Sequence, residues 1–337
     1  MESAAAVEAD LDFYGLCVRV GGEWADAVEE LRLDFAWFAR KPDGGAAEVE
    51  VVLERRPPEF DGFGDAPAAF VTPRNVVYQQ DGRTIVDYFG RAVSVLDRTG
   101  ERLVVQGEDK HLVHEAAYHF ILSRVGQHLE AQGLTRLHAL GLAGAEGAVA
   151  VMLPSGGGKS TLALRALEED GVGLLSEDSP LVDRRGRLHP FPLRIGINAT
   201  DADKLPEGSV RRLERMEAHP KLALELDAIA DRIEPSPQPL VHLVIGRRTL
   251  GRHAQLEPVR RTAAIGTLVR EAVVGVGIYQ GMEFVLQRGL RDIAGKLDIA
   301  WVRTACCAAA LARARVWRLT LGRDHDRNWA ELLPLLR

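Results

Sequence analysis

The sequence predicts an α/β protein in which a small β-rich N-terminal region precedes a larger region of alternating strands and helices. Two observations lead to this class. Short β-rich runs separated by turn residues occupy much of the first 107 residues. From residue 135 onward, apolar strand-like runs alternate with helix-like runs, as in α/β folds. We therefore expect a β-rich domain over residues 1–107 and an α/β domain over residues 108–337.

In the N-terminal region, turn residues separate the runs that we interpret as strands, and we expect strands throughout the first hundred residues. Residues 48–55 (EVEVVLER) partly alternate apolar and polar side chains, and residues 75–107 hold four further β-rich runs. These four are separated by Asp81-Gly82, by Gly90 and by the DRTG segment at 97–100. The sequence thus predicts an antiparallel meander.

The second region is expected to begin with a long helix that ends before Gly133, a plausible C-cap. Strands follow at 135–143 (TRLHALGLA) and 147–153 (GAVAVML), and the second is apolar without alternation, as in strands buried on both faces. A glycine loop, a helix in 158–170 and a strand in 171–178 then predict a βαβ unit.

The remaining chain is expected to hold a mobile loop or insertion at residues 198–238, which are polar, charged and interrupted by prolines. Its basic residues suggest a lid or a docking element for an acceptor, and the alternative is a solvated helix. These basic residues are Lys204, Arg211, Arg212 and Arg215. After it we expect a strand at 240–246, helices across 262–314, a strand at 315–321 and a closing helix at 328–336.

Composition and charge argue against several classes of protein. Lys and Arg number 42 against 48 Asp and Glu, a net charge of −6 that disfavours a dedicated nucleic-acid binder. The three cysteines, Cys17, Cys306 and Cys307, lack metal-ligand spacing, so we expect reduced structural thiols. The N-terminus does not resemble a signal peptide, and no run approaches the ~18 apolar residues of a membrane span, so we expect a cytoplasmic protein without membrane association.

The segment PSGGGKST, residues 154–161, carries the main functional signal. Glycines allow several backbone N–H groups to converge on a phosphate, and a helix N-terminus adds a favourable dipole. Lys159, which we expect to be exposed with little packing, is suited to reach β- and γ-phosphates, and Ser160 is suited to ligate Mg²⁺. Leu153 stands where the Walker A pattern has its first glycine. The alternative is a glycine-rich turn with an incidental lysine.

An acidic pair, Glu177 and Asp178, begins eighteen residues beyond Lys159 at the end of an apolar strand. P-loop proteins place a metal-binding carboxylate at such a strand end. Adjacent residues on a strand face opposite sides, so one acid is suited to hold Mg²⁺ while the other reaches a substrate. The alternative is an acidic turn before Pro180.

Together these residues resemble the HPr kinase/phosphorylase family and its relatives in gene clusters that modify peptides and proteins. Ser155, Gly156, Gly158, Lys159 and Ser160 match the family's loop, G-x-S-G-x-G-K-S. The family's next strand ends in two aspartates, of which the first acts as base and the second helps to bind Mg²⁺. The resemblance therefore implies Glu177 as base and Asp178 as metal ligand, together with ATP and Mg²⁺ as cofactors.

The resemblance also implies roles for a histidine and an arginine. His138 stands where the family has a histidine on the strand before the loop, and its alternative is a core histidine. Arg194 stands near the family's active-site arginine, and its alternative is a surface charge. The implied fold is the phosphoenolpyruvate-carboxykinase-like P-loop core with a mixed central sheet, and the family's subunit rings suggest a homo-oligomer.

Three functions follow as hypotheses. The leading one is a kinase that transfers the γ-phosphoryl group of ATP to a serine of a peptide or small protein. The others are a small-molecule kinase and a nucleotide-binding regulatory module without transfer chemistry. The candidate catalytic residues are Glu177, His138 and Lys159, and the candidate nucleotide-binding residues are Ser155, Gly156, Gly157, Gly158, Lys159, Ser160, Thr161 and Arg194. Arg247, Arg248 and Arg252 form a basic cluster interpreted as a solvated edge, with an acidic-peptide site as the alternative.

Overall fold

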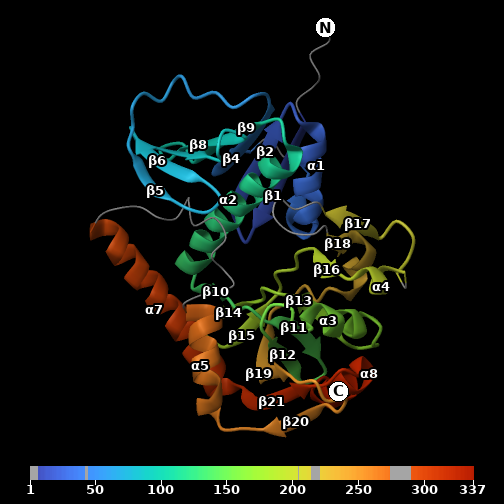
Figure 1. The fold of residues 1–337 in the computed structure, drawn as a ribbon. Coiled ribbons are helices and arrows are strands. Elements are labelled where there is room, and N and C mark those ends of the chain that lie inside the picture. Colours follow the sequence, from blue (N-terminus) through green and yellow to red (C-terminus); the bar gives the residue numbers. More distant parts are fainter. Residues whose placement is uncertain (1–6, 42–44, 204, 214–220, 274–289) are drawn as a thin grey trace. The chain divides into compact units, whose positions relative to one another are not determined.

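The computed structural model describes residues 7–41, 45–203, 205–213, 221–273 and 290–337 (Figure 1). Contacts divide the chain into two compact units: the first includes the chain up to Val125, and the second includes most of the chain from Gly126 onward. This boundary falls inside helix α2 (Lys110–Ala131), whereas the predicted boundary at residue 107 precedes it. Both units combine helices with strands, so the predicted α/β class is confirmed.

The first unit contains a mixed sheet with the strand order β3-β1-β2-β4-β9-β8-β7-β6-β5. Neighbours from β5 to β9 are antiparallel, whereas β2–β4 and β4–β9 are parallel. The meander predicted over 75–107 is therefore confirmed. Its strands are β1 (Val7–Phe13), β2 (Leu16–Gly22), β3 (Ala39–Arg40), β4 (Val49–Arg55), β5 (Ala68–Val71), β6 (Val76–Gln80), β7 (Arg83–Asp87), β8 (Ala92–Asp97) and β9 (Arg102–Gly107).

Helix α1 (Ala25–Asp34) shows that the expectation of strands throughout the first hundred residues is wrong. Its residues Ala27, Val28 and Leu31 are fully buried, a spacing that places them on one helical face. This face packs on β1 and β2. The predicted hairpin turn is present, because Asp81 and Gly82 both have positive φ angles, of 47° and 77°.

The second unit contains a mixed sheet with the order β10-β14-β15-β19-β12-β11-β13, and β21 pairs with both β19 and β20. Strands β12, β19 and β21 run parallel, and β11 lies antiparallel between β12 and β13. These strands are β10 (Leu134–Arg136), β11 (Leu140–Gly144), β12 (Gly147–Met152), β13 (Gly173–Ser176), β14 (Leu181–Asp183), β15 (Arg187–His189), β19 (Gln238–Arg248), β20 (Gln255–Pro258) and β21 (Arg315–Leu321).

The predicted βαβ unit is confirmed. Strands β12 and β13 both pair antiparallel with β11 and are therefore parallel to each other, and helix α3 (Lys159–Leu167) connects them. Every residue of β12 is buried, as its continuous apolar run predicts. This arrangement places the start of α3 at the carboxyl end of β12, the position where ligands collect in open α/β sheets.

Helix α2, whose last residues belong to the second unit, ends before Gly133, and the φ of 77° at this glycine confirms the predicted C-cap. Towards the C-terminus lie α5 (Ile265–Leu268), a π-helical turn (Val269–Val273), α7 (Leu290–Arg313) and α8 (His325–Leu332). Cys306 and Cys307 of α7 are free thiols in the core around β12 and β19, as is expected of structural cysteines.

The stretch 198–238, predicted as a mobile loop or insertion, carries regular structure in its described residues, and its role as a lid or docking element stays a prediction. It forms α4 (Ala199–Ala202), β17 (Val210–Leu213), β18 (Lys221–Leu224) and a 3-10 helix (Leu226–Arg232), and β18 joins a small sheet between β17 and β16 (Ile195–Ile197). Burial of Ala223, Leu224 and Leu226 stabilises this fold. Arg211 donates a 2.6 Å hydrogen bond to Glu225, and Lys204 and Arg215 lie outside the described residues.

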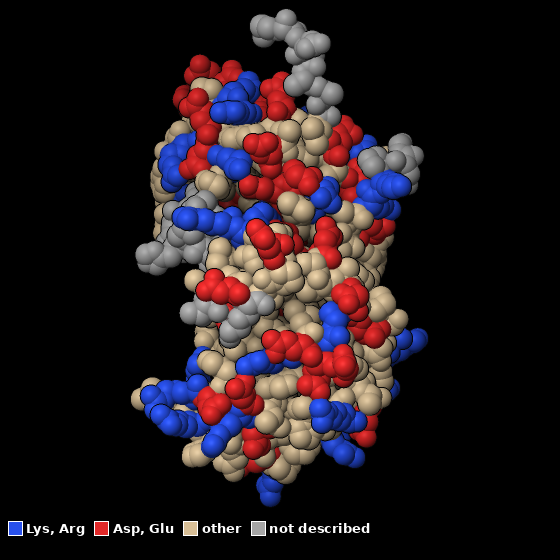
Figure 2. All heavy atoms as spheres, turned by 90° about the vertical axis from the view of Figure 1, so that its right-hand side faces the viewer, with Lys and Arg blue, Asp and Glu red and all other residues tan. Residues whose placement is uncertain are grey.

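Acidic and basic side chains are interspersed over the face of the molecule shown in Figure 2. This distribution agrees with the small net charge of −6. Among the described residues, no helix is both long enough and apolar enough to span a membrane.

Candidate functional site

The glycine loop turns the chain sharply from β12 into α3. Gly157 N–H donates a 2.8 Å hydrogen bond to the carbonyl of Pro154, and a Cβ at Gly157 would lie 2.7 Å from that same oxygen. Gly156 and Gly158 have φ angles of 72° and 109°, which favour glycine. The three glycines are therefore required by the turn itself, and the turn leads directly into the first turn of α3.

Leu153 occupies the position of the missing Walker A glycine, and the structure explains why a leucine fits there. Its side chain is buried and packs against Gly246 of the neighbouring strand β19. A Cβ at Gly246 would lie 2.4 Å from the Cδ2 atom of Leu153. The absence of a side chain at Gly246 thus leaves room for the side chain of Leu153.

Lys159 is buried, with a relative exposure of 5%, so the expectation of an exposed lysine with little packing is wrong. Its Nζ atom lies 2.8 Å from His138 Nε2, 2.9 Å from the carbonyl oxygen of Leu153 and 3.1 Å from Asp178 Oδ1. Side chains on a helix point towards its N-terminus. Lys159 is the first residue of α3, so its side chain turns back beneath the loop.

The acidic pair follows β13 directly, and its two carboxylates have different partners. Ser160 Oγ donates a 2.6 Å hydrogen bond to Glu177 Oε1, while Asp178 Oδ1 lies 3.1 Å from His138 Nε2 as well as near Lys159. Burial acts to raise the pKa of Asp178, but its hydrogen bond with His138 and the charge of Lys159 outweigh burial and lower the pKa. Asp178 is therefore ionised at neutral pH.

His138 lies in the short connection between β10 and β11, beside the acidic pair. The backbone brings it there, because Leu137 N–H donates to the Pro180 carbonyl and Ala139 N–H donates to the Asp178 carbonyl. The hydrogen bond with Asp178 raises the pKa of His138, while burial and the charge of Lys159 oppose this shift. The predicted residues His138, Lys159 and Asp178 thus form one hydrogen-bonded cluster.

Glu271 completes this cluster, and sequence reasoning missed it. It lies on the π-helical turn, is 5% exposed, and its Oε2 atom lies 2.6 Å from His138 Nδ1. Burial acts to raise the pKa of Glu271, but hydrogen bonds from His138 and Arg270 outweigh it and lower the pKa. The sequence did contain a signal for this residue, because Glu271 is the single acid in the apolar run LVREAVV. A carboxylate buried in such a run needs a partner.

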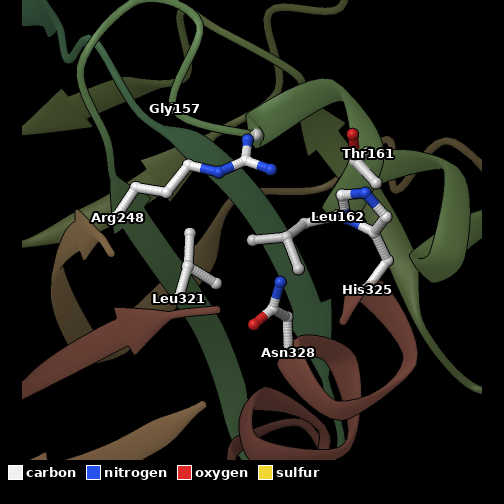
Figure 3. Close-up of a pocket in the computed structure, with 8 residues that line it drawn as sticks. Gly157, Thr161, Leu162, Arg248, Leu321, His325 and Asn328 are labelled. Carbon is white, nitrogen blue, oxygen red and sulfur yellow. The ribbon is translucent and has the colours of Figure 1, made fainter. Parts of the chain in front are cut away.

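The other predicted residues surround the loop. Ser155 is exposed and Thr161 is half-buried on the first turn of α3. Arg194 directly precedes β16, and β16 packs against α3. Arg248, interpreted from sequence as part of a solvated edge, ends β19 and borders a narrow recess beside Gly157, Gly158 and Thr161 (Figure 3).

In the described part of the chain, no group of three or more His, Cys, Asp or Glu side chains is arranged to hold a metal ion. A Mg²⁺ ion bound with a nucleotide needs fewer protein ligands, because one or two protein oxygens suffice when phosphates and water supply the other ligands.

No known family model matches this chain, and no curated protein matches its sequence. The resemblance to HPr kinases therefore depends on the motifs alone.

Proposed function

We propose that this protein is an ATP-dependent kinase that transfers the γ-phosphoryl group to a serine hydroxyl of a peptide or small protein. The observation that carries the proposal is the convergence of Lys159, Asp178 and His138 directly beneath a glycine loop at the start of α3. A buried cation, an ionised carboxylate and an imidazole at a phosphate-type loop are the groups that phosphoryl transfer requires.

The phosphates of ATP would lie in the glycine loop. Positive φ angles at Gly156 and Gly158 free the backbone amides to converge, and the dipole of α3 favours an anion at its first turn. Lys159 would neutralise the transferring phosphoryl group, since its ammonium group is already held at the base of the loop by the Leu153 carbonyl.

The contacts of the two acids support an exchange of the roles implied by the family resemblance. Glu177 accepts a hydrogen bond from Ser160, so this carboxylate and hydroxyl form an oxygen pair of the kind that Mg²⁺ prefers. Bound there, Mg²⁺ would supply charge neutralisation on the phosphates. Asp178, ionised beside His138, would accept the proton of the attacking serine hydroxyl.

His138 and Glu271 would orient this base. The imidazole contacts Asp178 through Nε2 and Glu271 through Nδ1, so both of its nitrogens are fixed by carboxylates. A fixed imidazole holds the Asp178 carboxylate in one position, and pre-organisation of this kind lowers the cost of reaching the transition state.

The test is incubation of the purified chain with labelled ATP, Mg²⁺ and peptides encoded beside its gene. Mass spectrometry should find one added phosphoryl group on a serine, and Asp178→Asn should abolish the addition. Release of ADP without a phosphorylated peptide would contradict the proposal and favour a module without transfer chemistry. Phosphorylation of a metabolite instead would identify a small-molecule kinase.

A further inference from the structure

A π-helical turn lies beside the cluster of His138, Lys159 and Asp178. This turn, Val269–Val273, directly follows helix α5 and carries Glu271, the buried partner of His138. Single π-helical turns are rare in proteins and are frequently found at functional sites. The residue before Glu271 on this turn is Arg270, which has no part in the transfer described above.

Arg270 is anchored on the same carboxylate that fixes His138. Its Nε atom donates a 2.7 Å hydrogen bond to Glu271 Oε1, while Glu271 Oε2 lies 2.6 Å from His138 Nδ1. The side chain of Arg270 is 58% exposed and forms no hydrogen bond or ion pair with any other described residue. A guanidinium carries further N–H donors on its two terminal nitrogens. The cation is therefore held at one edge, and its terminal nitrogens are open to a ligand.

The guanidinium of Arg270 lies a short distance from Asp178, the proposed base. Three successive contacts join them: 2.7 Å to Glu271, 2.6 Å from Glu271 to His138, and 3.1 Å from His138 to Asp178. Each residue of an extended peptide spans about 3.3 Å. The path through these contacts thus corresponds to at most about four residues of a peptide whose serine lies at Asp178.

Two apolar side chains are exposed on the helical segment that leads to Arg270. Ile265 and Val269 are 46% and 45% exposed, and their spacing of four positions places them on one helical face. The opposite face packs into the core through Ala264, Leu268 and Ala272. An apolar ridge that ends at a cation suits a polypeptide segment better than a small inorganic anion, which has no apolar surface to cover the ridge.

We propose that Arg270 binds an acidic side chain of the acceptor, so that the substrate class is a peptide or small protein with Asp or Glu within about four residues of the reacting serine. The inference rests on the proposed function, since it takes that serine to lie at Asp178. A guanidinium binds a carboxylate through two parallel hydrogen bonds, which supply attraction and direction together. Arg270 is on this basis a specificity-determining residue and does not touch the reacting atoms.

Arg248 is the competing cation for an acidic peptide. It ends β19, borders the glycine loop, and forms no hydrogen bond or ion pair with any other described residue. However, β19 lies on the opposite side of β12 from β13, the strand that leads to the acidic pair. An acid bound at Arg248 is therefore directed away from Asp178.

The experiment uses short synthetic peptides with a central serine, in which one aspartate is moved through the positions on either side. Each peptide has an asparagine analogue, and fluorescence polarisation measures the affinity of both for the full chain. For at least one position within about four residues of the serine, the aspartate peptide should bind about tenfold more tightly than its analogue.

Three variants locate the origin of this preference for aspartate. Arg270→Gln should reduce it to less than about twofold, because the side chain keeps its polarity and loses its charge. Arg270→Lys should retain part of it, because an ammonium group keeps the charge without the planar fork. Arg248→Gln, the matched change at the competing cation, should leave it unaltered. A ratio of two affinities is insensitive to a general loss of folded protein.

Equal affinities of the aspartate and asparagine peptides at every position would overturn the inference. A preference that survives in Arg270→Gln, or that disappears in Arg248→Gln, would do the same. Incubation of the same peptides with labelled ATP and Mg²⁺ tests the proposed function separately. Transfer to serine without a preference for aspartate contradicts the inference alone, whereas an Arg270-dependent preference without transfer to any peptide contradicts the kinase function alone.

Discussion

Ser160 Oγ lies 2.6 Å from Glu177 Oε1, so the hydroxyl at the start of α3 is hydrogen-bonded to the first acid after β13 and not to the second. The second acid, Asp178, contacts Lys159 and His138 instead. This separation of partners turns two adjacent carboxylates into two chemically different groups.

Substitution of the two acids should therefore give two different phenotypes. We expect Glu177→Gln to raise the Mg²⁺ concentration needed for half-maximal nucleotide binding, because it removes the charge beside Ser160. We expect Asp178→Asn to leave that concentration nearly unchanged and to lower turnover by about 100-fold or more, as loss of a general base does. Mg²⁺ titrations of binding and of rate measure both effects. Identical phenotypes would show that the two acids share one role.

Lys159→Ala should reduce both activity and stability. Loss of the buried ammonium group removes charge stabilisation of the transferring phosphoryl group, and we expect turnover to fall about 100-fold or more. It also leaves the Leu153 carbonyl without this donor and Asp178 with His138 alone, so the free energy of unfolding should fall by about 1–3 kcal/mol. Urea denaturation measures this change. Glu168→Ala, which removes only the exposed ion pair with Arg165 at the end of the same helix, should cost less than about 1 kcal/mol and serves as the control.

Gly157→Ala should weaken nucleotide binding by about tenfold or more, because its Cβ would meet the Pro154 carbonyl at 2.7 Å and force the loop to shift. Gly266→Ala introduces the same methyl group where no atom lies within 4 Å, and it should leave the affinity unchanged. Calorimetric titration with ADP compares the two variants. An alanine tolerated at Gly157 would mean that the loop geometry does not determine binding.

Asp183 should make folding stability depend on acid pH. Burial acts to raise its pKa, but hydrogen bonds from Arg187 and His189 outweigh burial and lower the pKa from 3.8 to about 2. The pKa of Asp183 is lower in the folded state than in the unfolded state. The stabilisation is therefore complete above roughly pH 4 and is lost as the pH falls towards 2.

Asp183→Asn should therefore reduce the free energy of unfolding by about 2 kcal/mol at pH 7 and by progressively less below roughly pH 4. Urea denaturation at a series of pH values measures the difference from the unsubstituted protein. Asp298→Asn, on an exposed residue of α7, is the matched control. A difference that stays constant down to pH 3 would rule out this carboxylate as the source of the dependence.

Local signals in the sequence determined the order of most elements and the position of the loop. Some features depend only on residues that are adjacent in the sequence, and these can be predicted without knowledge of the fold. Examples are the glycines of residues 156–158, the turn at Asp81-Gly82 and the uninterrupted apolar run of β12. Helix α1 was missed because its buried face shows only three apolar positions among charged residues. The strands within 198–238 were missed because charge and proline dominate that composition.

The tertiary structure alone decided which candidate residues meet. Glu271 lies 133 positions from His138, and only the packing of the π-helical turn beside the acidic pair brings their side chains to 2.6 Å. The burial of Lys159, the pairing of Ser160 with Glu177 and the unpaired state of Arg248 also depend on strands that are neighbours in the sheet but distant in sequence. A sequence specifies which groups are available, whereas distance, burial and dielectric surroundings, which set their chemistry, arise only when the chain has folded.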